Sequence, residues 1–324
     1  MHNFLDSSLK TTKNLLAFSA GVDSSALFFM LLDADIPFDI ALVNYGTREE
    51  ALEEESHAKA LAQRYKLKCY TINAPHFSNN FEKNARDFRY DFFEELIQIH
   101  HYDTLLTAHQ LNDQLEWLLM RLTKGAGLSE LLGLQEKTQR SNYILMRPLL
   151  SYSKEMLLNY LQENNLPYFI DESNSEDKYE RNRFRKSFAN ELMQEYHEGI
   201  SRSFDYLRQD KERLEAQFEH IYVDKKLHII KLLTPSSRVK ASDITLKKLG
   251  YLLSASQRKE IENKNSLVIG GLWAIEIQED LLYICPYITK PMPKEFKEKC
   301  RKYKIPQKIR SYCFVEEIVL EEII

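Results

Sequence analysis

Short apolar runs alternate with longer helical segments between Asn14 and about Arg147, and this alternation constrains the fold more than any other feature. The short runs are typical of strands and span Leu15–Phe18, Ile40–Tyr45, Lys68–Ile72, Thr104–Ala108 and Ile144–Met146. The longer segments show helical spacing and span Ser24–Leu32, Glu49–Tyr65, Phe81–His100 and Asn112–Leu122. This alternation predicts βαβ units, and therefore a Rossmann-like α/β domain with a mostly parallel sheet and helices on both faces. Ligands bind beyond the carboxyl ends of such strands, so functional residues are expected at that edge.

The rest of the chain predicts a second, smaller domain. One helix should end before Pro167, and a helical stretch from about Phe188 to Phe218 is long enough to bridge two domains. After His220, two apolar runs flank Gln278-Glu279-Asp280, which is typical of a hairpin turn. We therefore predict a catalytic domain over residues 1–205, followed over 206–324 by a helical connector and a small α+β domain.

Composition limits the class of protein. The formal net charge is −4 over 324 residues, so any contact with a polyanion must come from local basic patches. The four cysteines include no CxxC pair, which argues against a disulfide framework and against a thiolate zinc site. The first residues lack the apolar core of a signal peptide, and no apolar stretch approaches the roughly 18 residues that span a bilayer. These observations predict a cytoplasmic protein without membrane association.

The hexapeptide Ser-Ala-Gly-Val-Asp-Ser, residues 19–24, separates the first predicted strand from the first predicted helix. Gly21 would let the backbone approach a bound group and adopt a positive φ. Serine hydroxyls and the free N–H groups of the helix start would cradle phosphate oxygens. Asp23 would repel phosphate unless a cation lay between them, so its presence predicts Mg²⁺. The alternative is an ordinary turn in which Asp23 or Ser24 only caps the helix.

Two more polar clusters follow predicted strands. Asn44, Gly46 and Arg48 come after the second strand, where the glycine permits close approach of a ligand and the arginine could reach a phosphate. After the fourth strand, four residues are spaced to lie on adjacent turns of a helix start: His109, Asn112, Asp113 and Glu116. Taken singly, the first cluster could be an ordinary loop, and a lone histidine is more often structural than catalytic. Their shared position at one edge of the sheet favours a single site.

Together these segments resemble the tRNA(Ile)-lysidine synthases, a family of the PP-loop, or N-type, ATP pyrophosphatases. The hexapeptide is similar to the signature Ser-Gly-Gly-x-Asp-Ser, with Ala20 replacing a glycine, which we expect the fold to tolerate if φ at Ala20 is negative. Further elements are matched by Asn44–Arg48, by Arg86, Arg89 and Tyr90, by Ala108–Glu116, by Arg121 with Lys124–Gly127, by Arg147–Leu150, by Asp171–Asn174 and by Arg181–Arg185. The other departures are Tyr45 and Gln110 for histidines, Asn112 for an aspartate and Lys124 for an arginine.

The resemblance implies an ATP-dependent ligase that modifies tRNA. In the family, O2 of the wobble cytidine in the CAU anticodon of tRNA(Ile) attacks the α-phosphate of ATP and pyrophosphate leaves. The amine of L-lysine then displaces AMP to give lysidine. The implied catalytic residues are Asp23, His109, Asp113 and Glu116, with Mg²⁺ held by Asp23 and Asp113. The implied ATP-binding residues are Ser19, Ala20, Gly21, Val22, Asp23, Ser24, Asn44 and Arg48. The implied tRNA-binding residues are Arg86, Arg89, Arg121, Lys124, Asn174, Arg181 and Arg185. The resemblance also implies that the C-terminal domain over 206–324 binds tRNA, and its basic zone over residues 290–310 is a further candidate for this contact. A homodimer is possible.

Two rival interpretations are also consistent with the sequence. A PP-loop enzyme that inserts sulfur into a tRNA base generally needs paired catalytic cysteines, and this sequence has no CxxC. A non-catalytic RNA-binding adaptor with a decayed nucleotide site would explain Ala20, Gln110 and Asn112, but not the retained Asp23 and Asp113. Exchange of pyrophosphate into ATP that depends on tRNA would separate an enzyme from an adaptor.

Overall fold

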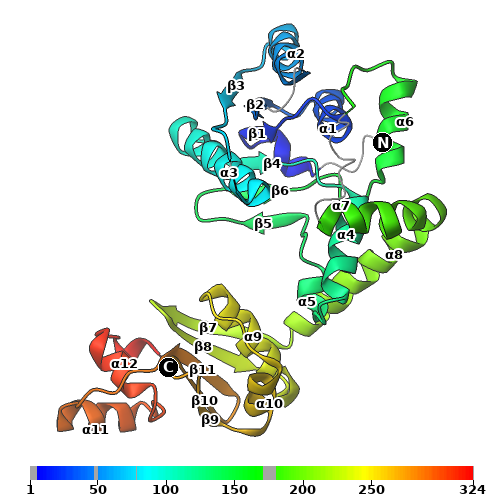
Figure 1. Ribbon diagram of the computed structural model, residues 1–324. Coiled ribbons are helices and arrows are strands. Elements are labelled where there is room, and N and C mark those ends of the chain that lie inside the picture. Colours follow the sequence, from blue (N-terminus) through cyan, green and yellow to red (C-terminus); the bar gives the residue numbers. More distant parts are fainter. Residues whose placement is uncertain (1–5, 47–49, 78, 171–179, 324) are drawn as a thin grey trace. The chain divides into compact units, whose positions relative to one another are not determined.

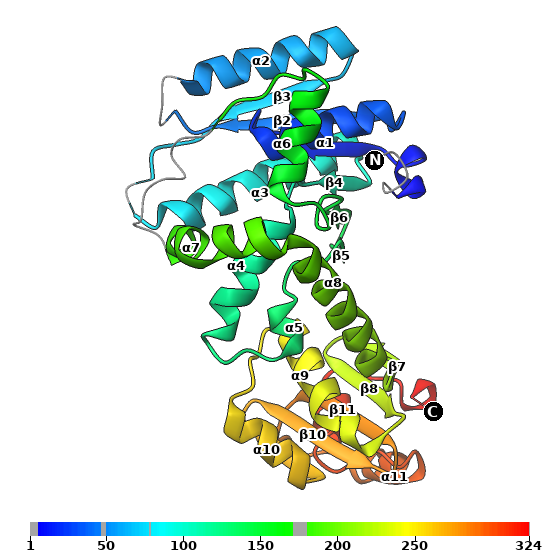
Figure 2. The ribbon, with the colours of Figure 1, turned by 90° about the vertical axis from the view of Figure 1, so that its right-hand side faces the viewer.

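The computed structural model describes residues 6–46, 50–77, 79–170 and 180–323 (Figures 1 and 2). The chain divides into two compact units, Met1–Leu207 and Arg208–Ile324. The division falls inside the longest helix, α8 (Asn190–Glu215). Each unit has its own sheet and its own core, and each is described by itself.

The first unit is built on a six-stranded sheet with the order β3-β2-β1-β4-β6-β5. Its strands are β1 (Asn14–Ala17), β2 (Phe38–Asn44), β3 (Cys69–Asn73), β4 (Thr104–Leu106), β5 (Lys137–Gln139) and β6 (Ile144–Met146). All neighbouring pairs are parallel except β5 with β6, which is an antiparallel edge. The order in which strands are added to the sheet reverses between β1 and β4, at its centre. A ligand site is expected at this point in such folds.

Helices cover both faces of this sheet because successive strand residues point to opposite sides. Leu16 packs with the helices α1 (Val22–Asp33), α2 (Glu50–Tyr65) and α6 (Lys154–Glu163). Its neighbour Leu15 packs on the other side, against α3 (Phe81–His100). The predicted α/β class with a parallel sheet is therefore confirmed.

A separate helical layer follows the sheet in the chain. It contains α4 (Leu111–Leu122), α5 (Leu128–Leu131), α7 (Glu180–Phe184) and the first part of α8, with a π-helical turn at Arg185–Ala189 between the last two. Leu111 and Leu115 of α4 share a core with Met193 and Phe204 of α8. Within this layer α7 packs against α4, and α4 begins shortly after β4 in the chain.

The second unit is an antiparallel sheet with the order β7-β8-β11-β10-β9. Its strands are β7 (Phe218–Asp224), β8 (Leu227–Leu232), β9 (Ser266–Ile269), β10 (Trp273–Gln278) and β11 (Leu281–Pro286). One face is covered by α9 (Arg238–Lys248) and α10 (Ala255–Asn263), and the other by α11 (Lys294–Lys302) and α12 (Arg310–Val315). The predicted hairpin at Gln278-Glu279-Asp280 joins β10 to β11. Among the described residues, no helix combines the length and apolar character needed to cross a bilayer.

Candidate active site

The loop between β1 and α1 is held by its own serine side chains. The Ser24 hydroxyl accepts a hydrogen bond from the Ser19 backbone N–H (3.2 Å), donates to the Gly21 carbonyl (3.1 Å) and lies 3.1 Å from the Ser19 hydroxyl. The Ser25 hydroxyl donates to the Ala20 carbonyl (3.0 Å). The loop is therefore organised before any ligand arrives, and the first N–H groups of α1 lie at its end.

The left-handed residue of this loop is Ala20, with φ of 59°, and not Gly21, whose φ is −71°. The positive φ expected at Gly21 was therefore wrong, and Ala20 is accommodated with a positive φ although a negative one was the stated condition. An alanine in this region costs about 1–2 kcal/mol relative to the right-handed region. The Ala20 carbonyl is fixed by the Phe169 N–H (2.9 Å) as well as by Ser25, and these bonds hold the residue in place. Ala20 is also fully buried.

A cavity of about 400 Å³ opens beside the loop. It is lined by residues that follow three different strands, among them Ser19, Ser24 and Asp23 after β1, Tyr45 after β2, and His109 and Asp113 after β4. Arg89 from α3 and Lys154 from α6 also line it. Ser24 and Asp113 thus face one space, as the sequence predicted. Arg48, the third residue expected there, lies outside the described residues.

Asp23 is a cavity carboxylate that the surrounding protein disfavours in its charged form. Burial, and next the nearby Asp113 carboxylate, raise the pKa of Asp23 to about 6. Its Oδ1 atom is buried and has no hydrogen-bond partner. An unpaired carboxylate oxygen beside a phosphate-sized loop fits a cation that takes one or two carboxylates together with substrate phosphates, as Mg²⁺ does. Among the described residues, no group of three or more His, Cys, Asp or Glu could hold a metal by itself.

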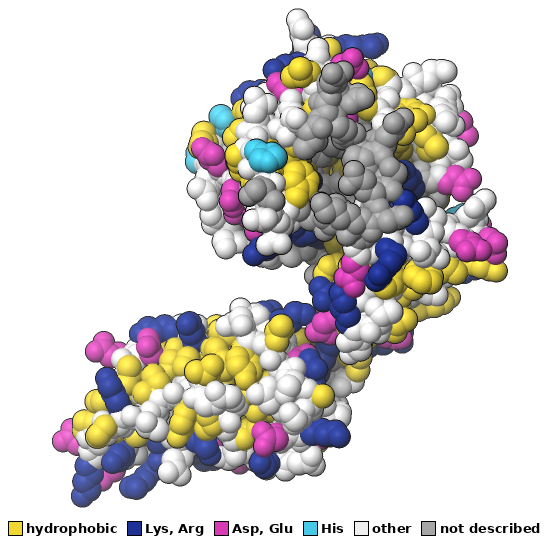
Figure 3. Space-filling model, viewed as in Figure 1, with side chains coloured by type: hydrophobic (Ala, Val, Ile, Leu, Met, Phe, Trp, Pro, Cys, Tyr) yellow, Lys and Arg dark blue, Asp and Glu magenta, His cyan; other side chains and the backbone are white. Residues whose placement is uncertain are grey.

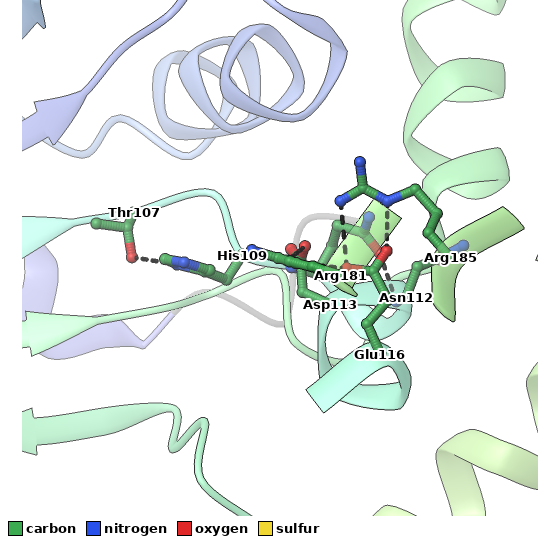
Figure 4. A network of polar contacts seen from close by, with 8 residues as sticks. Thr107, His109, Asn112, Asp113, Glu116, Arg181 and Arg185 are labelled. Carbon is green, nitrogen blue, oxygen red and sulfur yellow. Dashed lines mark hydrogen bonds and ion pairs between the residues drawn. The ribbon is translucent and has the colours of Figure 1, made fainter. Parts of the chain in front are cut away.

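The carboxylates of α4 are already paired with arginines (Figure 4). Glu116 is 1% exposed, and its carboxylate accepts from Arg181 Nε (2.6 Å) and Arg185 Nε (2.5 Å). Asp113 Oδ1 pairs with Arg181 Nη2, and its Oδ2 accepts from the Gln110 N–H (2.9 Å). The two arginines therefore join α7 and the π-helical turn to the first turns of α4. From the sequence, both arginines are predicted to contact tRNA. In this structure they form ion pairs with the predicted catalytic carboxylates.

Comparisons with known proteins agree with this arrangement. A family model described as a PP-loop domain matches residues 1–192. A tRNA(Ile)-lysidine synthase of Campylobacter jejuni (strain RM1221) is 45% identical over 311 residues, which cover 96% of this chain and 95% of the relative. The chain belongs to the tRNA(Ile)-lysidine synthase family. The synthase of Helicobacter pylori (strain 26695) is 44% identical, covering 95% of this chain and 91% of its own.

A solved structure shares the fold at low sequence identity. A U34-tRNA thiolase from Methanococcus maripaludis superposes with a TM-score of 0.50 at 17% identity, covering 64% of this chain and 75% of its own. At this identity the likeness supports the fold alone. The cysteines of the present chain do not suit sulfur chemistry, because Cys285, Cys300 and Cys313 are buried and burial raises the pKa of each. The fourth, Cys69, is partly buried in β3, and burial raises its pKa too.

Two departures from the tRNA(Ile)-lysidine synthase pattern acquire structural roles at the start of α4. Gln110 is the N-cap: its side chain accepts from the Asn112 N–H (2.6 Å), while its own N–H donates to Asp113. This reciprocal pair satisfies helix N–H groups as a capping box does. The Asn112 side-chain oxygen accepts from the Lys154 backbone N–H (3.1 Å) and so ties α4 to the first residue of α6.

His109 lies in the cavity wall as a neutral side chain. Its Nδ1 is 3.0 Å from the Thr107 hydroxyl. Burial, with the positive charges of Arg147, Arg181, Arg89 and Arg86, lowers the pKa of His109 to about 3. A histidine with this pKa carries no proton to give near neutral pH, so its available chemistry is hydrogen bonding by the neutral ring. Thr107 was not found from the sequence, since a threonine at a strand end has no distinctive pattern.

The remaining predicted residues are placed as follows. Asn44 is not a cavity residue; its amide donates to Glu55 (2.9 Å) and accepts from the Gly46 N–H (2.9 Å), and so shapes the loop after β2. Val22 also lines the cavity. Arg86 lies over the Tyr90 ring, Arg121 lies over the Trp117 ring at 4.3 Å, and Lys124 pairs with Glu180 at 2.7 Å. Asn174 lies outside the described residues. No sequence pattern singles out Lys154 or Phe169, which reach the cavity through the packing of α6 and the chain after it.

Proposed function

We propose that this chain attaches L-lysine to the wobble cytidine of tRNA(Ile) with a CAU anticodon, consuming ATP and releasing AMP and pyrophosphate. ATP use follows from the PP-loop family. One observation supports the rest most strongly. The 45% identity to a tRNA(Ile)-lysidine synthase extends over 96% of the chain, and so includes both the cavity residues and the second unit.

The first step needs a nucleotide phosphate beside the β1–α1 loop. Backbone N–H groups at the start of α1 and the hydroxyl of Ser19 would donate hydrogen bonds to phosphate oxygens. Asp23 has the unpaired oxygen that could hold Mg²⁺, whereas both oxygens of Asp113 already accept hydrogen bonds. When bound, the ion would neutralise charge on the departing pyrophosphate. Arg89 of α3, which also lines the cavity, would help to stabilise the negative charge of the pyrophosphate.

The second step needs a lysine amine that has lost its proton, because an ammonium has no lone pair for the attack. Asp113, which lines the cavity, and Glu116, the buried carboxylate one turn further along α4, are the candidates to orient this amine. Arg181 bridges both of them, so an incoming ammonium competes with that guanidinium for the same oxygens. Loss of lysine transfer alone in Asp113→Asn would assign this role to Asp113.

The tRNA would contact exposed basic side chains outside the cavity. In the first unit, the exposed Lys124 and the half-buried Arg121 follow the carboxylate cluster in the chain. In the second unit, the exposed basic side chains on and around α11 are Lys290, Lys294, Lys297, Lys299, Arg301, Lys302 and Lys304; Figure 3 shows how Lys and Arg are distributed over one face of the molecule. Contacts of this kind release counterions, so tRNA affinity should fall steeply with salt.

Two assays on the full chain test the proposal. The first measures exchange of labelled pyrophosphate into ATP with and without tRNA(Ile), and the second measures ATP-dependent transfer of labelled lysine to that tRNA. A lysidine synthase gives both signals, a tRNA thiolase gives no lysine transfer, and an adaptor gives neither. Asp113→Asn should lose lysine transfer alone if Asp113 orients the amine, but exchange as well if it holds the metal. Full activity of this variant in both assays would remove Asp113 from the mechanism.

A further inference from the structure

One cation of the cavity wall, Lys154, has no role in any of the motifs. It is the first residue of α6, directly after the N-cap Ser153, whose hydroxyl accepts from the Met156 N–H (3.2 Å). Leu157 and Leu161 of α6 are buried in the same core as α1. The backbone of Lys154 is therefore fixed relative to the β1–α1 loop by packing between the two helices.

A side-chain bond also joins these two helices. The Tyr160 hydroxyl of α6 donates to Asp33 at the end of α1 (2.6 Å). Since α1 begins with the residues of the loop, any shift of α6 along α1 would have to break this bond and disturb the shared core. Lys154 is thus held beside the loop by a rigid element, which is what a binding residue needs.

The backbone and the side chain of Lys154 have different partners. The backbone N–H donates to the Asn112 side chain. The ammonium group makes no hydrogen bond or ion pair within the described part of the chain, although it lines the cavity with Asp23 and Ser24. Its positive charge lowers the pKa of Asp23, against the larger effect of burial. Lys154 is thus an exposed residue of the cavity wall whose ammonium group has no protein partner among the described residues.

The charges around the start of α4 explain why this cation stays available. Asp113 and Glu116 form ion pairs with Arg181 and Arg185. An aspartate at position 112 would supply a third carboxylate next to the first residue of α6. Asn112 offers an oxygen of the same shape without the charge, so it holds α6 but leaves Lys154 uncompensated.

We propose that Lys154 binds a phosphate group of ATP, and that Asn112 keeps this cation available by anchoring α6 without neutralising it. The inference deepens the proposed function and rests on ATP binding in this cavity. Helices α1 and α6 begin with Val22 and Lys154, which line the cavity, and α4 has the lining residue Asp113 in its first turn. Each helix adds partial positive charge at its N-terminus. A lysine adds a full point charge to this field, which is how lysines bind phosphates.

The test measures ATP affinity by calorimetry on the full-length protein without tRNA. Lys154→Met keeps the shape of the side chain and the backbone N–H but removes the charge, and should weaken ATP binding about ten- to a hundred-fold. Lys154→Arg should recover much of the affinity. Asn112→Asp should also weaken binding, and this effect should shrink when Lys154 is already methionine. Lys10→Met, an exposed lysine outside the cavity, is the matched control and should change nothing.

Steady-state kinetics on the same variants separate a phosphate contact from a general structural role. Lys154→Met should raise KM for ATP and leave KM for lysine unchanged, with an unaltered urea midpoint of unfolding. Unchanged ATP affinity in Lys154→Met, or a change confined to KM for lysine, would overturn the inference. A wild-type protein that binds ATP through Lys154 but forms no lysidine would instead refute the proposed function and leave this inference standing.

Discussion

Asp23 should make the ligand-free protein less stable at neutral pH than a variant that lacks its charge. Its pKa is raised from 3.8 to about 6, so the folded state holds the proton more tightly than the unfolded state. Protons then favour folding, and stability falls as the pH rises from about 4 to about 6. About two pKa units correspond to about 3 kcal/mol at neutral pH. Asp23→Asn should therefore stabilise the protein by about 3 kcal/mol near pH 7.5 but by only about 1 kcal/mol near pH 4.5.

The measurement is urea unfolding followed by tryptophan fluorescence. The chain has two tryptophans, Trp117 in the first unit and Trp273 in the second, so a Trp273→Phe background reports on the first unit alone. Asp91→Asn, at an exposed position of α3, is the matched control and should show no such pH dependence. The pH dependence is the diagnostic quantity, because a new contact of the amide would add the same free energy at every pH.

A difference between Asp23→Asn and its parent that is equal at the two pH values would refute the reasoning. It would mean that Asp23 ionises as easily in the folded protein as in the unfolded chain. A larger difference at low pH would reverse the sign and point to a carboxylate stabilised by its surroundings. The expected result would identify Asp23 as a residue that lowers stability and is retained for binding a cation or ligand.

Three further predictions concern the surroundings of the site. Glu116→Gln removes the carboxylate that pairs with Arg181, and should lower the free energy of unfolding by about 1–3 kcal/mol in urea titrations; no loss would mean that the arginines find other partners. In Gly133→Ala the new Cβ would lie 2.2 Å from Nε1 of Trp117, so a loss of about 1–3 kcal/mol with a shifted tryptophan emission is expected, and unchanged emission would contradict that contact. Ala20→Val places a β-branched residue at a buried position with φ of 59°, and should lower the melting temperature by several degrees, whereas an unchanged value would show that the loop relaxes at no cost.

The elements of the first unit could be predicted because their sequence pattern is regular. Phe81–His100 and Ile144–Met146 agree with the predicted bounds, and α1, α2 and α4 begin or end within two residues of theirs. The edge strand Lys137–Gln139 was not predicted, since its exposed polar residues carry no apolar period. The hairpin of β7 and β8 was missed for a related reason: β7 alternates between exposed and partly buried residues, so its apolar signal is weak.

The site was predictable in its chain positions but not in its pairing. Spacing placed Asp23 and Asp113 at strand ends, and the parallel sheet brings them to one cavity. The ion pairs of Arg181 depend on the packing of α7 on α4, about 65 residues away in the chain, and no local pattern encodes such a contact. The positive φ of Ala20 could not be predicted either, because the left-handed residue of a loop is usually expected to be a glycine, and Gly21 stands next to it.

The central claim is that one cavity of this chain activates a tRNA base with ATP and joins it to lysine. Mass spectrometry of the wobble nucleoside, after incubation of purified protein with tRNA(Ile), ATP and lysine, tests it most directly. We expect cytidine at that position to gain the mass of a lysine residue only when ATP is present, and Asp23→Asn to abolish the gain. An unmodified cytidine from a protein that binds both ATP and the tRNA would contradict it.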